Sequence, residues 1–310
     1  MADQERVLFE GEAQVEPPHP TFSRSTVVVE PPGEGAGFWA GGPSAVRGPD
    51  GAVYLAYRLR RPYGVGRGYA NVIARSEDGE EFEEIAVLHR DQFDCDSLER
   101  PALVVRPDGG WRIFVSCATP GTKHWRVDLL ESDTPDGFDP DTRRTVLAGD
   151  AHEGLKDPVV HWDGRRWHMW VCAHDLDQVG QEDRMVTRYA ASPDGADWTV
   201  GEVALARRPG RWDARGARVA AVLFDGGRVT AYYDGRATAE QNAEERTGIA
   251  VGPSPERLVA TGEPLPGPGF GTDSLRYLSV VADPGGFRFY YETSRLDGAH
   301  DLRTEYVPRP

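Results

Sequence analysis

The chain has 310 residues, of which 39% are hydrophobic and 27% charged, and its formal net charge is -15 at pH 7. Nucleic acid is an unfavourable partner for such a chain, because binding a polyphosphate depends on Lys and Arg side chains that displace counterions. No apolar run approaches the length of a membrane span, and the first residues, MADQERVLFEGE, lack the basic start and apolar stretch of a secretory signal. We therefore expect a cytoplasmic protein that binds neither nucleic acid nor a membrane.

Cysteine and glycine usage narrows the fold class. Cys95, Cys117 and Cys172 are odd in number and show no CxxC spacing, so neither a disulfide framework nor a metal site is indicated. The 36 glycines and 24 prolines supply the turns that short strands need. This composition favours an all-β chain.

Turn sequences divide the chain into five units, with 55 to 62 residues from one turn to the next. They are Asp50-Gly51, Asp108-Gly109, Asp163-Gly164, Asp225-Gly226 and the looser Asp283-Pro284-Gly285. Repeats of this size that are built from hairpins are typical of propeller blades.

Strand patterns follow the same order in each unit. The first segment is rich in small and branched residues, as in GGPSAVRG and DPVVHWDG, and the second is rich in aromatic residues, as in WRIFVSC and FRFYYE. A third strand follows in most units (NVIARS, VDLLES, VTRYAAS and TGIAVG), whereas TAEQNAEER, from Thr238 to Arg246, is the nearest approach to a helix. The last predicted strand is HDLRTEYV, near the C-terminus.

These elements predict one domain over residues 1–310, a single five-bladed β-propeller of four-stranded antiparallel blades. The fifth unit lacks a strand, so we expect residues 1–38 to supply a closing strand and an entry loop, with 7–15 or 26–29 as the strand. A ring closed by its N-terminal and C-terminal strands leaves no exposed sheet edge.

The first strand of each blade lines the central channel, so the residues at its mouth are candidates for a site. Aligning the units on Pro43, Pro101, Pro158, Val219 and Tyr277 places five residues at one level: Gly42, Arg100, Asp157, Arg218 and Arg276. Glu99 and Lys156 stand one position earlier. A cluster of cations in an acidic protein suits a polar, anionic ligand.

The segments SLERPALV, GLKDPVVHWDGRRWHMW and AYYDGRATAEQNAEERTGIA resemble the five-bladed propeller glycoside hydrolases and phosphorylases, the superfamily that holds families 32, 43, 62, 68 and 130. Lys156-Asp157-Pro158 is similar to the Arg-Asp-Pro motif of families 32 and 68, which implies that Asp157 stabilises an oxocarbenium-like transition state. The tract from Asp234-Gly235-Arg236 to Gly248 resembles a stretch of family 130, which implies substrate or phosphate contacts for Asp234, Arg236 and Glu245.

The sequence departs from this pattern in the first unit. Families 43 and 32 carry a catalytic Asp there, whereas this chain reads Gly41-Gly42-Pro43. An acid/base role must then be filled by another residue or by phosphate. We expect Glu99 to be the catalytic partner of Asp157, or else to form a structural ion pair with Arg100, Arg218 or Lys156. Reserves for the acid are Asp234, Glu244, Glu245 and Glu292.

Other side chains have two open interpretations. Arg100, Arg218 and Arg276 would bind phosphate or a uronate carboxylate, or would neutralise acids in the channel. Trp39, Trp125 and Trp212 would stack on sugar rings or pack between blades. His174 and His300 would hold an axial metal ion or water, or would serve as hydrogen-bonded structural residues.

The sequence thus predicts a carbohydrate-active enzyme that cleaves or transfers a glycosidic bond, either an inverting glycoside hydrolase or a glycoside phosphorylase. Its partner would be a small carbohydrate or an anionic sugar, and it would need no cofactor beyond inorganic phosphate as a co-substrate. The alternative is a non-catalytic propeller that binds a sugar or an anionic metabolite, which Gly42 motivates because a carboxylate is expected there. The sugar and the oligomeric state stay open.

Overall fold

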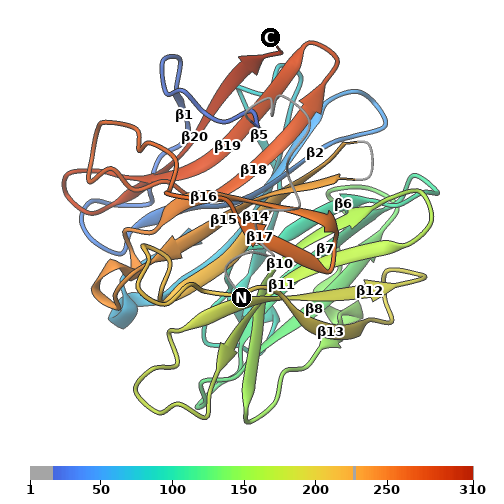
Figure 1. The fold of residues 1–310 in the computed structure, drawn as a ribbon. Coiled ribbons are helices and arrows are strands. Elements are labelled where there is room, and N and C mark those ends of the chain that lie inside the picture. The colour runs from blue at the N-terminus through green and yellow to red at the C-terminus, as the bar shows by residue number, and fades with distance from the viewer. Residues whose placement is uncertain (1–16, 226–227, 310) are drawn as a thin grey trace.

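The computed structural model describes residues 17–225 and 228–309, which form strands and short 3-10 helices without an α-helix in those ranges (Figure 1). The alternative closing strand at 7–15 and part of the Asp225-Gly226 turn lie outside the described residues. The all-β prediction is confirmed. The predicted helix-like stretch contains only the 3-10 helix η4 (Glu240–Asn242).

The strands fall into four sets of five, according to their place within a unit. The first strands are β2 (Trp39–Arg47), β6 (Ala102–Val105), β10 (Glu153–Trp162), β14 (Gly216–Asp225) and β18 (Arg276–Asp283). The second strands are β3 (Val53–Arg60), β7 (Trp111–Ala118), β11 (Trp167–Asp175), β15 (Arg228–Arg236) and β19 (Gly286–Ser294). The third strands are β4 (Gly68–Ser76), β8 (Trp125–Ser132), β12 (Met185–Ser192), β16 (Arg246–Ser254) and β20 (His300–Pro308). The outer strands are β5 (Glu83–His89), β9 (Arg144–Leu147), β13 (Thr199–Leu205), β17 (Arg257–Ala260) and β1 (Thr26–Val29).

Hairpin chemistry explains why these segments pair. Between the first two strands of a unit, Gly51 and Gly109 take φ values of 85° and 89°, which a residue with a Cβ adopts only at a cost. The remaining 3-10 helices, η1 (Tyr63–Val65), η2 (Arg90–Gln92) and η3 (Pro140–Thr142), lie in connections between strands.

Sheet pairing joins the chain's ends. Strand β1 pairs antiparallel with β20, as expected for the segment at 26–29. Two single parallel pairs, Trp39 with His300 and Met185 with Gly216, join neighbouring units into sheets of eight, eight and four strands. The number of blades therefore cannot be read from the number of sheets, and the five-bladed propeller stays a prediction.

The hydrophobic core is divided among consecutive units. One cluster packs Tyr54 and Ile73 of the first unit against Trp111 of the second, and another packs Tyr290 of the last unit against Leu55 of the first. Three further clusters lie between the units that follow in sequence. The five first strands contact one another in a closed cycle, β2 to β6, β6 to β10, β10 to β14, β14 to β18 and β18 to β2. The units thus surround one axis.

Candidate functional site

Irregularities in the first strands shape the centre of the molecule. The antiparallel register of β2, β10 and β18 shifts after Gly41, Lys156 and Arg276. The next residues, Gly42, Asp157 and Tyr277, have positive φ values of 61°, 54° and 53°. Bulges re-aim the side chains beside them, and a non-glycine residue with positive φ is held there by its surroundings.

This register corrects the sequence alignment in two units. Arg218 and Arg276 pair with Asp234 and Glu292 of the second strands, just as Lys156 pairs with Cys172. They therefore lie level with Lys156 and Gly41, one position before the level that we predicted. The error arose because β14 and β18 lack the proline that marks the bulge in the other units.

Glu99 and Glu292 meet at Arg58, a side chain that the sequence analysis missed. Arg58 is only 1% exposed, and it pairs with Glu99 and, at 3.4 Å, with Glu292. The prediction that Glu99 would pair with Arg100, Arg218 or Lys156 is wrong, because Arg58 enters from the second strand of the preceding unit. Arg58 could have been found from the predicted hairpin of the first unit, in which it lies opposite Gly41.

Glu292 fills the space above the first unit's glycines. A Cβ on Gly41 would lie 1.8 Å from Oε2 of Glu292, and this oxygen accepts a hydrogen bond of 3.1 Å from the backbone N–H of Gly42. Oε1 lies 2.7 Å from Nδ1 of His300 and 3.4 Å from Nε of Arg276. A carboxylate of the last unit thus lies beside the two glycines of the first.

Arg218 forms the centre of a second group of charges. Its guanidinium lies 3.4 Å from Asp157 and 2.9 Å from Asp234, and it also contacts Glu245. Glu245 in turn pairs with Arg236 and, at 3.4 Å, with Arg276. These residues are each at most 4% exposed, so their charges are compensated by one another rather than by water.

Asp157, the first catalytic candidate, is fully buried in this network. Its Oδ1 accepts a hydrogen bond from the backbone N–H of Arg100 at 3.2 Å, and its Oδ2 accepts one from the Tyr277 hydroxyl at 3.2 Å. Lys156 lies 3.8 Å away. Tyr277 was used only to align the units, yet its ring packs 3.8 Å from the Arg218 guanidinium and 4.8 Å from that of Arg276.

The carboxyl groups differ in their electrostatics. Burial would raise the pKa of Glu99, but the charges of Arg58 and Lys156 outweigh it, so this pKa lies well below its ordinary value. The pKa values of Glu245 and Glu292 fall to about 2, because nearby arginines likewise overcome burial. Asp234 has a raised pKa, because its burial and the charge of Glu245 outweigh the hydrogen bond from Arg218.

A pocket of about 250 Å³ opens where the first strands begin. Its lining residues include Tyr63, Arg67, Lys123, Trp125, His174 and Glu182. Lys156 lies 4.7 Å over the Trp125 ring, and its side chain is 14% exposed, so it connects this mouth pocket with the buried network. Burial, reinforced by Lys156, lowers the pKa of His174 to about 3, which keeps its imidazole neutral.

Two arginines at this end have no carboxylate partner among the described residues. Arg60 stacks 4.3 Å over Trp39, and Arg67 lies 5.3 Å over Tyr63 and 5.6 Å over Trp125. The Nε of each arginine is buried without a hydrogen-bond partner. Both were missed from sequence, where nothing distinguishes them from surface arginines.

The other candidates are placed as follows. Trp39 is 7% exposed and stacks on His300 at 4.6 Å, so it lies beside the network rather than in the open pocket. Trp212 packs on Tyr233 at 5.4 Å and donates a hydrogen bond to the carbonyl of Gly262. Arg100 binds the carbonyl of Pro43 and lines a second cavity along the axis.

No cluster of ligands for a metal ion exists among residues 17–225 and 228–309. The Nδ1–H of His174 donates to the carbonyl of Glu182 and His300 contacts Glu292, so each has a partner within the protein. No helix in these ranges has the length and apolar character that crossing a membrane requires.

No family model matches the sequence, and no curated protein is detectably similar to it. Its structure, however, is similar to that of a thermostable family-43 glycoside hydrolase, with 14% identity, a TM-score of 0.67, and coverage of 87% of this chain and 90% of that one. A GH43_1 enzyme from Xanthomonas citri in complex with xylotriose is 16% identical with a TM-score of 0.66, and the match covers 93% of this chain and 91% of that one. The β-1,2-mannobiose phosphorylase from Listeria innocua is 15% identical with a TM-score of 0.63, and the match covers 90% of this chain and 93% of that one. The chain therefore has the propeller fold of these glycoside hydrolases and phosphorylases.

Proposed function

We propose that this propeller has five blades and that it is an enzyme acting on a glycosidic bond of a small carbohydrate, with inorganic phosphate as the attacking group. The blade number is supported by the closed cycle of contacts among β2, β6, β10, β14 and β18 and by the five interunit clusters. The activity is supported by carboxyl groups gathered where those strands begin, in a fold shared with glycosidases and a phosphorylase.

The observation that carries the proposal is the divergence of two carboxyl groups on one guanidinium. Arg218 contacts both Asp234 and Glu245, yet the pKa of Asp234 is raised and that of Glu245 is about 2. Neighbouring groups whose pKa values are pushed apart are the usual signature of an acid paired with a permanent anion. Asp234 is the only carboxyl with a raised pKa in the described network, so we assign it as the proton donor.

One protein acid is sufficient for phosphorolysis. A phosphate oxygen bonds to the anomeric carbon, the bond from that carbon to the glycosidic oxygen breaks, and the acid's proton goes to the departing oxygen. The products are a sugar 1-phosphate and the released sugar. Asp157, which resembles a transition-state stabiliser in sequence, would face the positive charge that develops at the anomeric carbon, and Glu99 would assist it from the mouth side.

Cations without carboxylate partners favour an anion in the mouth pocket. Arg67 lines this pocket and has an Nε without a hydrogen-bond partner, and Lys156, over the same Trp125 ring, lies 3.8 Å from Asp157. Arg60, whose Nε also lacks a partner, stacks on Trp39 outside the pocket lining. Burial lowers the pKa of Arg60, although Glu99 opposes this, so a bound anion would stabilise its charge. A phosphate, or an anionic group on the sugar, has the chemistry that this site accepts.

A screen of disaccharides and short oligosaccharides with and without phosphate tests the proposal. We expect sugar 1-phosphate only when phosphate is present, and a KM for phosphate at least tenfold higher in Arg67→Met, which removes a guanidinium from the pocket lining. Arg61→Met is the matched control, because Arg61 stacks on Tyr69, which does not line the mouth pocket. Release of free sugar without phosphate would instead identify a hydrolase, in which Glu292 takes the place of the missing carboxylate.

A second candidate is a protein that binds a sugar or an anionic metabolite without turning it over. The burial of Asp157 and Asp234, both 0% exposed, favours it, because a substrate must displace Arg218 or Arg276 to reach them. Ligands that raise the melting temperature without any product in the same screen would support this candidate.

A further inference from the structure

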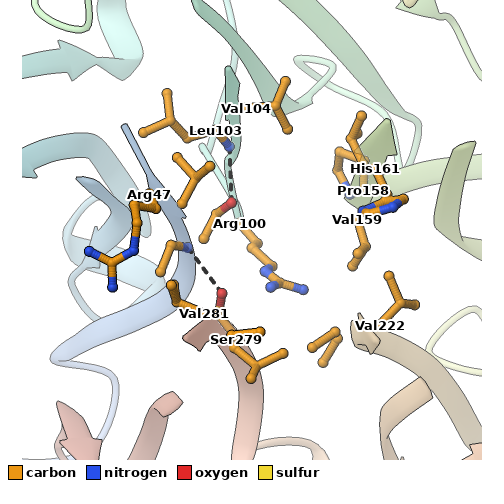
Figure 2. Close-up of a pocket in the computed structure, with 18 residues that line it drawn as sticks. Arg47, Arg100, Leu103, Val104, Pro158, Val159, His161, Val222, Ser279 and Val281 are labelled. Carbon is orange, nitrogen blue, oxygen red and sulfur yellow. Dashed lines mark hydrogen bonds between the residues drawn. The ribbon is translucent and has the colours of Figure 1, made fainter. Parts of the chain in front are cut away.

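The axial channel lies on the far side of the charge network from the mouth pocket. It is a cavity of about 350 Å³ lined by residues of all five first strands together with Arg100, which precedes β6. Its lining combines valines and alanines, such as Val104, Val159 and Val222, with the polar side chains of Ser44, Arg47, Arg100, His161 and Ser279. Figure 2 shows the Arg100 guanidinium pointing into the space between Val159, Val222 and Ser279.

Arg100 is held in place by backbone carbonyls and keeps one donor group free. Its Nε and Nη2 donate to the carbonyl of Pro43 at 3.0 and 2.8 Å, and Nη2 also lies 3.5 Å from the carbonyl of Leu278. Its Nη1 is buried without a hydrogen-bond partner, although the residue is only 3% exposed. An unsatisfied charged donor of this kind is rare in folded proteins.

Two hydroxyl groups in the same cavity also have a free hydrogen. The Ser44 oxygen accepts a hydrogen bond from the backbone N–H of Leu103 at 2.9 Å, and the Ser279 oxygen accepts one from that of Ala45 at 3.0 Å. Neither hydroxyl donates a hydrogen bond within the described parts of the chain. Both serines line the cavity with Arg100, so each can turn its O–H into it.

The charge of Arg100 lacks a counter-ion. It forms no ion pair with any described carboxylate, and burial lowers its pKa to about 10 even though Asp234 and Asp157 act in the opposite direction. Asp157 and Asp234 are themselves bound to Arg218. An uncompensated buried charge is costly, so an anion in the channel would stabilise the fold.

We propose that the channel binds a small monovalent anion, such as chloride or bromide, through Nη1 of Arg100 and the hydroxyl groups of Ser44 and Ser279. A cation is disfavoured by the guanidinium. A dianion such as sulfate is disfavoured because its desolvation cost rises with the square of its charge, whereas the site offers one positive charge without an ion pair, that of Arg100, since Arg47 at the rim pairs with Asp283. This inference does not depend on the proposed enzymatic function, because the channel and the mouth pocket share none of their lining residues.

Thermal unfolding of the full chain tests the site. Sodium bromide replaces sodium gluconate at constant ionic strength, and we expect the melting temperature of the wild type to rise with bromide. Arg100→Met is expected to weaken bromide at least tenfold, and Ser279→Ala about two- to tenfold, the loss of one hydrogen bond. Arg47→Met is the matched control, because Arg47 lines the same cavity at its exposed rim, and it should respond like the wild type.

Crystals grown in bromide give a second measurement that does not depend on the folding of a variant. We expect an anomalous peak within hydrogen-bond distance of Nη1 of Arg100. The inference is overturned if density in the channel shows no anomalous signal, which would identify water, or if Arg100→Met responds to bromide as the wild type does. Sulfate that stabilises the wild type as well as bromide, through Arg100, would overturn the assignment of a monovalent anion.

Discussion

Arg218 and Arg100 stand at two ends of the same axial region, and each is 3% exposed, yet their surroundings are opposite. Arg218 contacts three carboxylates, those of Asp157, Asp234 and Glu245. Burial lowers the pKa of both arginines, but around Arg218 the carboxylates reverse this and raise its pKa well above the ordinary value, whereas the pKa of Arg100 falls to about 10.

The difference shows that burial alone does not decide what a charged side chain does. In the buried network, Arg218 and Arg276 lie opposite Asp234 and Glu292 of the second strands, so the ladder itself supplies their counter-charge. In the channel, Arg100 is bound by backbone carbonyls and lies near serine hydroxyls, without an ion pair to a described carboxylate. The network is therefore internally neutralised around Arg218, whereas the charge of Arg100 lacks a counter-ion.

The largest expected effect comes from removing Arg218. Arg218→Met leaves three buried carboxylates without a shared cation and should lower the free energy of unfolding by about 3–5 kcal/mol. Arg100→Met removes a cation that has no ion pair and should cost only about 1–2 kcal/mol, the value of its hydrogen bonds to Pro43. Urea unfolding at low halide concentration measures both. If both variants lose the same free energy of unfolding, the ion pairs of Arg218 do not stabilise the fold more than the hydrogen bonds of Arg100 do.

The second prediction sharpens the assignment of the acid. Asp234→Asn should reduce kcat by about 10²–10⁴-fold, the contribution of a general acid, on the substrate that the screen identifies. Asp213→Asn is the matched control, because Asp213 is equally buried and paired with Arg208 but lies outside the network. It should lose stability and keep its kcat. A variant of Asp234 that keeps wild-type turnover would remove the acid from this position.

The third prediction concerns the space that Glu292 occupies. Gly41→Ala places a methyl group against its carboxylate and should lower the free energy of unfolding by about 1–3 kcal/mol, as overpacking does. Gly64→Ala is the control, because nothing lies within 4 Å of a Cβ there, and it should change stability by less than about 0.5 kcal/mol. If both variants unfold at the same urea concentration as the wild type, Glu292 is not confined at this glycine.

The last prediction concerns the pH dependence of stability. The pKa of Glu292 is about 2 in the folded protein and lies below its ordinary value, so its contribution to stability is present above about pH 4.5 and is lost as the pH falls toward 2. Glu292→Gln should flatten the acid side of the stability curve by up to one proton, about 1.4 kcal/mol per pH unit. Glu83→Gln, at an exposed position of β5, should leave the slope unchanged. Parallel curves for Glu292→Gln and the wild type would contradict the assignment.

Local turn chemistry made the fold accessible from sequence. The Asp-Gly turns and the alternation of small and aromatic strands predicted the hairpins between first and second strands. The segment at 26–29, one of two alternatives for the closing strand, is β1 and pairs with β20. The alignment failed only at Arg218 and Arg276, because the bulge position that holds proline in the other units holds Ala220 or Leu278 here. No single residue type marks a bulge of this kind, so its position cannot be predicted reliably from the sequence.

The sequence predicted which residues form the site better than it predicted how they pair. Lys156, Asp157 and Arg218 do meet at the centre, as their place near the starts of first strands suggested, and Arg236 and Glu245, which were named from a family resemblance, join them there. Their pairing depends on contacts between units, such as Arg58 with Glu99 or Glu292 above Gly41, and no periodicity in one unit encodes these. Arg100 was expected beside the ligand and instead faces the axial channel.

The pairing of β1 with β20 also affects how the molecule is synthesised. Thr26 and Val27 pair with Thr304 and Arg303, so this ladder joins two segments of which one is synthesised long before the other. Until β20 emerges, β1 has no partner edge and the last interunit interface cannot form. Contacts of such long sequence separation form slowly, so we expect closure of the propeller ring to be the last step of folding. Until β20 has been synthesised, the nascent chain presents β1 to chaperones as an unpaired strand.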